Sequence, residues 1–224
     1  MKIGFRIERS IARAPAVLLD KFRGIPTGNL ADAGDRLCAM HYSIKPISQK
    51  FTLVGSALTI RAWPGDNLIV NKAIAMSGPG DVLVIDNGQF EGGSVWGDLT
   101  SFMAKNAGAA GMVTNGLVRD IAGIVEADLP VFARGSVPNG GFKRGPGEIG
   151  YPVVCGGVTV KSGDIIAADI DGVVVIPLEL AEKVLNGVPA ILENERKTME
   201  KIRAGMTTPD NLDKILKDSG YELA

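Results

Sequence analysis

The sequence predicts a layered α/β fold with a mixed β-sheet and C-terminal helices. Helix-like and strand-like patterns alternate through residues 1–133, short strand-like runs then cluster in residues 153–176, and helix-like patterns finish the chain. A regular doubly wound sheet or a TIM barrel would keep alternating to its end. No internal repeat or linker divides the 224 residues, so we expect a single domain, 1–224.

Two amphipathic helices are predicted near the start of the chain. The first covers residues 11–23, with Pro15 in its first turn. The second begins at Thr27, whose hydroxyl can cap a helix, and its apolar positions continue to Met40. His41, the only histidine, follows this helix, and a lone histidine is more often a surface or helix-end residue than a metal ligand.

Buried strands and a short helix follow. Residues 53–62 and 82–85 are rich in β-branched and apolar side chains, which is typical of strands. Between them, residues 68–76 are predicted to be helical, with Asp66 or Asn67 as the capping residue.

A glycine-rich segment, residues 92–97, leads into a third predicted helix over residues 98–105. Its apolar residues are Leu99, Phe102 and Met103, and this spacing predicts that they share one buried face.

Residues 111–114 are typical of a short buried strand, and Arg119 and Asp120 follow its turn. A helix N-terminus facing this pair would offer unpaired N–H groups to a carboxylate. Arg119 could bind the same anion with its planar guanidinium, and Asp120 could hold a hard divalent cation. The alternative is a solvated surface pair of little energetic consequence.

The second half is predicted to be rich in strands. Residues 131–133 form a strand, and residues 138–146 form a long glycine-rich loop. Four further strands at β-meander spacing and two closing helices are expected at residues 153–154, 158–160, 165–168, 173–176, 178–203 and 211–217.

Composition narrows the class of protein. The formal net charge is −1 and the basic residues are scattered, so neither nucleic acid nor an anionic membrane surface is an expected partner. Cys38 and Cys155 have no CxxC spacing and are expected to be free thiols. No apolar run approaches the ~20 residues that span a bilayer, and the start lacks a signal-peptide pattern. We therefore expect a soluble cytoplasmic protein.

Several familiar chemistries have no motif in this chain. The sequence contains no P-loop, no GxGxxG between a strand and a helix, and no GxSxG. With one histidine, a metal site would have to use oxygen ligands, which suit Mg²⁺ or Mn²⁺. Lys72 and Lys105 are predicted on solvent-facing helix surfaces, where nothing marks them as Schiff-base lysines.

Four segments, in order, resemble the RraA-like proteins, a family that includes the 4-hydroxy-4-methyl-2-oxoglutarate / 4-carboxy-4-hydroxy-2-oxoadipate aldolases. The resemblance covers about residues 25–180 and leaves a C-terminal helical extension over about 178–224. It implies a β/β/α swivelling-domain fold, assembled as homotrimers or hexamers with active sites at subunit interfaces. The segments are SALTIRAWPGDNL, GPGDVLVIDNGQ, GMVTNGLVRD and GGVTVKSGDIIAADIDGVVVIP.

The resemblance also implies roles for individual residues. Arg119 matches the arginine that binds the pyruvate-like part of the substrate and steadies the enolate, and Asp120 matches the metal-ligating aspartate. The backbone amides that hold the substrate carboxylate match the helix start at Gly97, Asp98, Leu99 and Thr100.

One residue departs from the family pattern. The acid that should follow the Arg-Asp pair by three positions is replaced by Gly123, and the nearest later carboxylates are Glu126 and Asp128. An acid at this position would support the metal from outside its direct ligands.

These roles fit a divalent-metal-dependent pyruvate aldolase that cleaves 4-hydroxy-2-oxo acids, with oxaloacetate decarboxylation as a companion activity. The alternative from another class is a non-catalytic protein that regulates an RNA-processing ribonuclease by binding it. As the resemblance describes that branch, it lacks the aspartate of the Arg-Asp pair, so Asp120 favours the enzyme.

Overall fold

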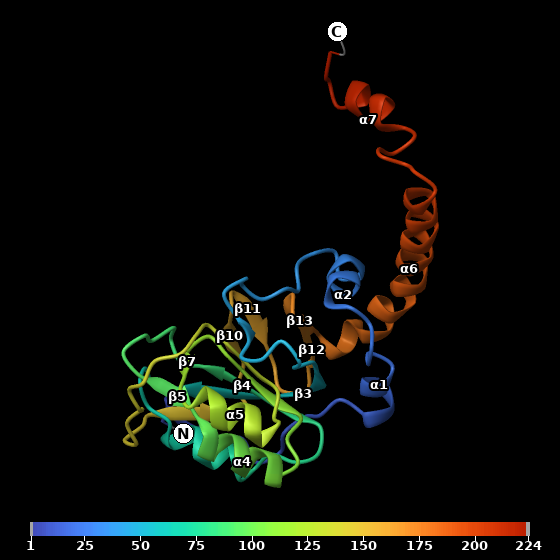
Figure 1. The fold of residues 1–224 in the computed structure, drawn as a ribbon. Helices are drawn as coiled ribbons and strands as arrows, with labels where there is room; N and C mark the ends of the chain where they lie inside the picture. Colours follow the sequence, from blue (N-terminus) through green and yellow to red (C-terminus); the bar gives the residue numbers. More distant parts are fainter. Residues whose placement is uncertain (1, 223–224) are drawn as a thin grey trace.

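The computed structural model describes residues 2–222 and has the expected mixed α/β architecture (Figure 1). Its helices are α1 (Ala16–Asp20), α2 (Thr27–Ala33), α3 (Leu68–Ile74), α4 (Asp98–Asn106), α5 (Ile121–Ala127), α6 (Ala181–Arg203) and α7 (Leu212–Asp218), with a 3-10 turn at Leu178–Leu180. Its strands are β1 (Phe5–Ile7), β2 (Lys45–Pro46), β3 (Leu53–Ala62), β4 (Asp81–Asp86), β5 (Ser94–Trp96), β6 (Gly111–Thr114), β7 (Leu117–Val118), β8 (Val131–Ala133), β9 (Gly147–Ile149), β10 (Val153–Cys155), β11 (Val158–Val160), β12 (Ile165–Asp169) and β13 (Gly172–Ile176).

The long strand β3 organises the main sheet. It pairs in parallel with β4, and the parallel order continues through β6 to β8. On its other edge the first half of β3 pairs antiparallel with β12, and its last residues pair antiparallel with β9. One strand therefore joins the parallel half of the sheet to the β-rich half.

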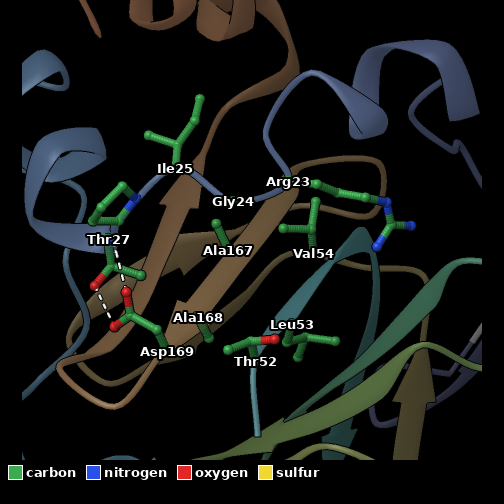
Figure 2. A pocket seen from close by; sticks show the side chains of 11 residues that line it. Arg23, Gly24, Ile25, Thr27, Thr52, Leu53, Val54, Ala167, Ala168 and Asp169 are labelled. Atoms are coloured by element: carbon green, nitrogen blue, oxygen red, sulfur yellow. Dashed lines mark hydrogen bonds between the residues drawn. The ribbon is translucent and has the colours of Figure 1, made fainter. Parts of the chain in front are cut away.

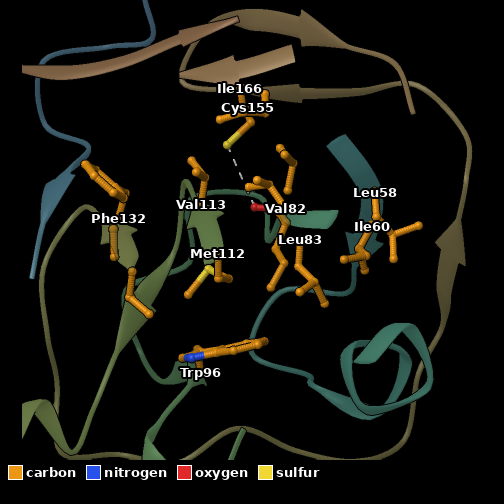
Figure 3. Packing of buried hydrophobic residues seen from close by; sticks show 14 of the residues in the cluster. Leu58, Ile60, Val82, Leu83, Trp96, Met112, Val113, Phe132, Cys155 and Ile166 are labelled. Carbon is orange, nitrogen blue, oxygen red and sulfur yellow. Dashed lines mark hydrogen bonds between the residues drawn. The ribbon is translucent and has the colours of Figure 1, made fainter. Parts of the chain in front are cut away.

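Apolar side chains cover both faces of this sheet. Figure 3 shows Trp96 on one side of β4 and β6, with Cys155 and Ile166 on the other. The strand side chains between them, such as Val82, Leu83, Met112 and Val113, are fully buried. A second, smaller core packs α2 and the start of α6 against β12 and β13. Burial on both faces explains the continuous apolar runs of β4 and β6.

The C-terminal helix leaves the body of the protein. The buried residues of α6 are Ala181, Val184 and Val188, all within its first turns. Its outer turns are largely exposed and project away with α7 at their far end (Figure 1).

The first two helices are shorter than the pattern predicts. Residues 11–15 are not helical, because Arg13 binds the Asp81 carboxylate and the Ala14 N–H donates to Ser56 Oγ, so this segment is tied to the sheet. Helix α2 ends at Ala33, and Asp35 and Arg36 adopt positive φ angles that no helix allows. Thr27 is its first helical residue, and its hydroxyl donates to Asp169.

The predicted four-stranded meander is divided between two sheets. β10 and β11 form a separate hairpin, whereas β12 and β13 form a hairpin that joins the main sheet through β3. Five short strands were not predicted, namely β1, β2, β5, β7 and β9. Each is two or three residues long, too short to show a periodic pattern.

Two further expectations concern the whole chain. Within residues 2–222 no helix is long and apolar enough to cross a membrane. Cys38 and Cys155 are both free, as predicted, and burial raises the pKa of the Cys155 thiol.

Candidate functional site

Two short parallel strands bring the predicted site residues together. β5 and β7 pair side by side, so the chain leaves β5 at Gly97 beside the point where it leaves β7 at Arg119. The Arg119 N–H donates to the Trp96 carbonyl at 3.0 Å, which extends the pairing by one residue. The starts of α4 and α5 therefore lie next to each other, and the two helices pack together (Figure 1).

Arg119 and Asp120 are in contact, but neither side chain uses all of its hydrogen-bonding groups. Arg119 Nε lies 3.1 Å from Asp120 Oδ2, and both side chains are about two-fifths exposed, at 43% and 40%. Among the described residues the two terminal nitrogens of the guanidinium have no acceptor, and Asp120 Oδ1 has no donor. An anion and a cation could therefore each find a free partner here.

Gly97 makes this close approach possible. A Cβ atom at this position would lie 2.8 Å from Asp120 Oδ2 and 3.4 Å from Arg119 Cγ. The backbone of Gly97 is extended, at φ −158°, so any residue could adopt it. Glycine is needed here because a side chain would collide with Arg119 and Asp120, and not because of the backbone conformation.

The start of α4 is held by two hydroxyl groups. Thr100 Oγ1 accepts from the Gly97 N–H at 2.9 Å and donates to the Gly97 carbonyl, and Ser101 Oγ donates to the same carbonyl. The Leu99 N–H donates to Asp98 Oδ1. Of the four amides expected to bind a carboxylate, those of Asp98 and Thr100 have no acceptor within the described chain.

The predicted buried face of α4 is wrong. Leu99, Phe102 and Met103 are exposed, whereas Thr100, Ser101 and Ala104 are buried. Hydrogen bonds of the hydroxyl groups hold this face of small residues toward the interior. Ser101 Oγ, for example, also accepts from the buried Trp96 indole N–H. Leu99 and Met103 instead line the pocket described next.

A pocket of about 230 Å³ contains these groups. Every residue assigned to the site from the sequence lines it, namely Gly97, Asp98, Leu99, Thr100, Arg119 and Asp120. No sequence signal pointed to the other polar residues of the lining, which are Ser94 of β5, Asn67 and Asn71 of the α3 region and Lys143 in the loop before β9. Gly140 on that loop touches the arginine, since a Cβ there would lie 2.9 Å from Arg119 Nη1.

A different carboxylate occupies the space beside Gly123. A Cβ atom at Gly123 would lie 2.5 Å from Asp98 Cβ and 3.1 Å from Asp98 Oδ2. The side chain of Asp98 thus occupies the space that a side chain at position 123 would enter. Asp128 does not replace that acid, because Lys50 binds it at 3.0 Å and holds its pKa below the usual range.

The oxygen donors fit a largely hydrated Mg²⁺ better than a fully protein-bound ion. Within residues 2–222, no three histidine, cysteine, aspartate or glutamate side chains converge in a way that could hold a metal. Asp98 and Asp120 are the carboxylates that line the pocket. Mg²⁺ usually keeps several waters and takes one or two protein carboxylates, so this donor set is sufficient for it.

A larger cavity, of about 480 Å³, lies elsewhere (Figure 2). Its floor is formed by β3 and β12, and its acid, Asp169, already accepts from the hydroxyl and N–H of Thr27. Its arginine, Arg23, is paired with Asp20. Both oxygens of Asp169 are thus occupied within the protein, whereas Asp120 Oδ1 has no donor among the described residues.

Residues set aside on sequence grounds also lie outside the pocket. His41 accepts or donates a hydrogen bond with Ser43 at 2.8 Å on the surface. Lys72 is exposed, as predicted. Lys105 is exposed as well, and its ammonium donates to the Ala127 carbonyl at 2.7 Å.

Similarity to other proteins identifies the family to which the fold belongs. Residues 18–175 match the RraA-like family, described as Aldolase/RraA. A Halalkalibacterium halodurans protein, provisionally named 4-hydroxy-4-methyl-2-oxoglutarate aldolase, is 40% identical over 175 residues, which cover 78% of this chain and 83% of the relative.

Two solved structures share the fold. An uncharacterized protein from Pseudomonas syringae pv. tomato has a TM-score of 0.77 at 30% identity, covering 88% of this chain and 96% of its own. The RNA-processing inhibitor RraA from Thermus thermophilis has a TM-score of 0.63 at 30% identity, covering 68% and 92%.

Proposed function

This chain belongs to the RraA-like family, and from that membership and its pocket we propose that it is a divalent-metal-dependent carbon–carbon lyase. The reaction is the cleavage of 4-hydroxy-2-oxo acids to pyruvate, with oxaloacetate decarboxylation as a companion activity. One observation carries the proposal: Arg119 presents free guanidinium N–H groups, and Asp120 a free carboxylate oxygen, to the same open pocket.

The start of α4 and Arg119 would bind the 2-oxo-acid end of the substrate. The free N–H groups of Asp98 and Thr100 lie at the positive end of the helix dipole, which favours a carboxylate. The guanidinium of Arg119 lines the same pocket and provides fixed positive charge for the keto oxygen. That oxygen becomes negative when the C3–C4 bond breaks, so charge placed there lowers the barrier.

Asp120 would hold Mg²⁺ or Mn²⁺, with Asp98 close by to orient its water ligands. The ion, when bound, supplies Lewis acidity toward the oxygens of a 2-oxo acid. Asp98 has the position to support it, because its carboxylate fills the space beside Gly123. On this account, the carboxylate of Asp98, in the neighbouring helix α4, takes over the role of the acid that is absent at position 123.

The family also supplies the alternative, because the Thermus thermophilis relative is named as an RNA-processing inhibitor. A docking protein has no need of a free carboxylate beside a free arginine within a pocket. The retained Asp120 therefore favours the enzyme.

A pyruvate-release assay coupled to lactate dehydrogenase tests the proposal. The protein is freed of metal with EDTA and supplied with Mg²⁺ or Mn²⁺ and one substrate at a time: 4-hydroxy-2-oxoglutarate, 4-hydroxy-4-methyl-2-oxoglutarate or oxaloacetate. We expect metal-dependent pyruvate formation with at least one 4-hydroxy-2-oxo acid. Absence of turnover with all three, in protein shown to bind the metal, would count against the enzyme.

We further propose a homotrimer or a hexamer, as the family resemblance implies. Light scattering at micromolar concentration would measure the mass directly, and a monomer of 23.5 kDa would contradict it.

A further inference from the structure

The Arg119 side chain lies against two glycines. At its stem, a Cβ atom on Gly97 would lie 3.4 Å from Arg119 Cγ. At its head, a Cβ atom on Gly140 would lie 2.9 Å from Nη1, 3.5 Å from Cζ and 3.9 Å from Nη2. The Gly140 backbone therefore packs against the whole guanidinium group. Its φ angle is not in the left-handed region, so glycine is needed here for this contact and not for the backbone conformation.

The loop that joins β8 to β9, residues 134–146, is bonded near its start to β7 and β5. The Val118 carbonyl of β7 accepts from the Val137 N–H at 2.9 Å. The Ser94 N–H of β5 donates to the Asn139 carbonyl at 2.8 Å. The two strands that lead into the pocket therefore also fix the first half of this loop.

A buried aspartate fixes the second half of the loop. Asp66 is 2% exposed, and its Oδ1 accepts from the Leu68 N–H at the start of α3. Its Oδ2 accepts from the N–H groups of Arg144 and Gly145 in the loop. Backbone hydrogen bonds at Phe142 add to this attachment. One carboxylate therefore joins the loop to α3, and the loop is held on both sides of the glycine that touches the arginine.

Little else restrains the guanidinium of Arg119. Its side chain is 43% exposed, and its contact with Asp120 is made by Nε. A long side chain with this much exposure would otherwise exchange among several rotamers. Catalysis by a fixed charge needs that charge in place before the reaction starts. A firmly attached backbone against the guanidinium takes up the space that other rotamers would need.

We propose that the 134–146 loop sets the position of the Arg119 guanidinium, with Gly140 as the contact and Asp66 as the anchor. Both are positioning residues, because they act through the arginine. The effect on turnover rests on the proposed function, whereas the effect on the arginine itself does not.

Gly140→Ala is the direct test. The added methyl group would meet Nη1, the end of a flexible side chain, so we expect the arginine to move and the fold to stay intact. Release of pyruvate should fall at least about tenfold in kcat/KM, since a misplacement of about 1 Å can cost about a hundredfold. Gly28→Ala is the control, because a Cβ atom there meets nothing within 4 Å, and it should leave turnover unchanged.

A double-mutant cycle shows whether Gly140 acts through the arginine. In Arg119→Lys protein there is no guanidinium to displace, so adding Gly140→Ala should lower kcat/KM less than about twofold further. An equal loss in both backgrounds would mean that Gly140 has only a structural role, and would overturn the inference. So would unchanged turnover in the single Gly140→Ala variant of an active enzyme.

The anchor is tested with a matched pair of buried aspartates. Asp164 is 4% exposed, accepts from the N–H groups of Lys161 and Leu178, and does not line the pocket. Asp66→Ala and Asp164→Ala should both lower the thermal midpoint. In the folded protein, Asp66→Ala alone should lower kcat/KM, at least about tenfold. Equal turnover by the two variants would overturn the role of Asp66, and the cycle at Gly140 decides if Asp66→Ala does not fold.

Chemical labelling separates this inference from the proposed function. Phenylglyoxal reacts with guanidinium groups, and mass spectrometry of the peptides gives the rate for each arginine. In Gly140→Ala we expect Arg119 to react at least about threefold faster, because a side chain displaced from the loop opens to solvent more often. Arg13, which is bonded to the buried Asp81, should react equally in both proteins. Equal rates at Arg119 would overturn the inference, whether or not the protein is a lyase.

Discussion

Two arginine–carboxylate contacts in this protein differ in their surroundings. Glu148 in β9 is 1% exposed and accepts from Arg6, Arg61 and the Gly4 N–H. Asp120 is 40% exposed and touches one guanidinium, that of Arg119. Both oxygens of the first carboxylate accept hydrogen bonds from the protein, and the second carboxylate has an oxygen left over.

The difference separates a structural ion pair from a binding site. The hydrogen bond from Arg6 holds the pKa of Glu148 below its usual range, and β1 is attached to β9 through these contacts. Arg6 also stacks on the Tyr151 ring, 4.0 Å from its centroid. We infer that incomplete pairing in a pocket, rather than the presence of an ion pair, marks the functional residues.

Asp120→Asn is the strongest test of the comparison. Asparagine keeps the size of the side chain and tolerates the left-handed backbone at this position, φ 57°. Metal-dependent pyruvate release should fall by more than about a hundredfold, beyond what partners outside the metal's ligands usually contribute. The thermal midpoint should stay within a few degrees of wild type, and near-normal activity after EDTA treatment and Mg²⁺ addition would contradict the assignment.

Glu148→Gln should have the opposite profile. We expect a loss of about 3 kcal/mol in the free energy of unfolding, at the low end for broken buried pairs because Arg6 and Arg61 keep some solvent contact. Urea denaturation measures it, and the activity of the folded fraction should be normal.

The pH dependence identifies the cause of that loss. Because the pKa of Glu148 is lowered in the folded state, its contribution is present above the ordinary glutamate value of about 4.3 and is lost as the pH falls through the folded value. The stability difference between wild type and Glu148→Gln should shrink below about pH 4. A difference that does not vary with pH would indicate a packing effect instead.

Arg119→Lys should produce a smaller loss in turnover than Asp120→Asn. Lysine keeps the charge but not the planar pair of N–H donors, so kcat/KM should fall about a hundredfold, corresponding to ~2.7 kcal/mol. If the guanidinium also stabilises the developing charge, kcat itself should fall. Equal turnover of every 2-oxo acid by this variant would remove Arg119 from the site.

The sequence predicted well the strands that are apolar runs between turn signals. Strands β3, β6 and β8 begin and end at the predicted residues, because continuous apolar runs between turn signals leave little choice. The prediction from the sequence failed where a single tertiary contact determines the local structure. Arg13 bonded to Asp81 keeps residues 11–15 out of a helix, and Trp96 bonded to Ser101 turns the apolar side of α4 outward.

The site residues were likewise predicted where they are close in the sequence and missed where they come from distant segments. The pocket includes every residue taken from the Gly97–Asp120 stretch, because β5 and β7 place both ends of that stretch together. Asn67 and Lys143 come from distant segments that Asp66 joins through hydrogen bonds. No local sequence pattern predicts that connection. The nearness of Asp98 to Gly123 is likewise a fact of helix packing rather than of spacing.

The backbone at Asp120 has a consequence for engineering this protein. Asp120 precedes the first turn of α5, where an aspartate commonly caps the helix, yet its side chain makes no capping bond and its backbone is left-handed. Glycine at this position would relieve the backbone without loss of a cap, so selection for heat resistance alone should discover Asp120→Gly early. The variants it enriches would be robust but inactive, and a screen for thermostable forms of this protein therefore needs a turnover criterion from its first round.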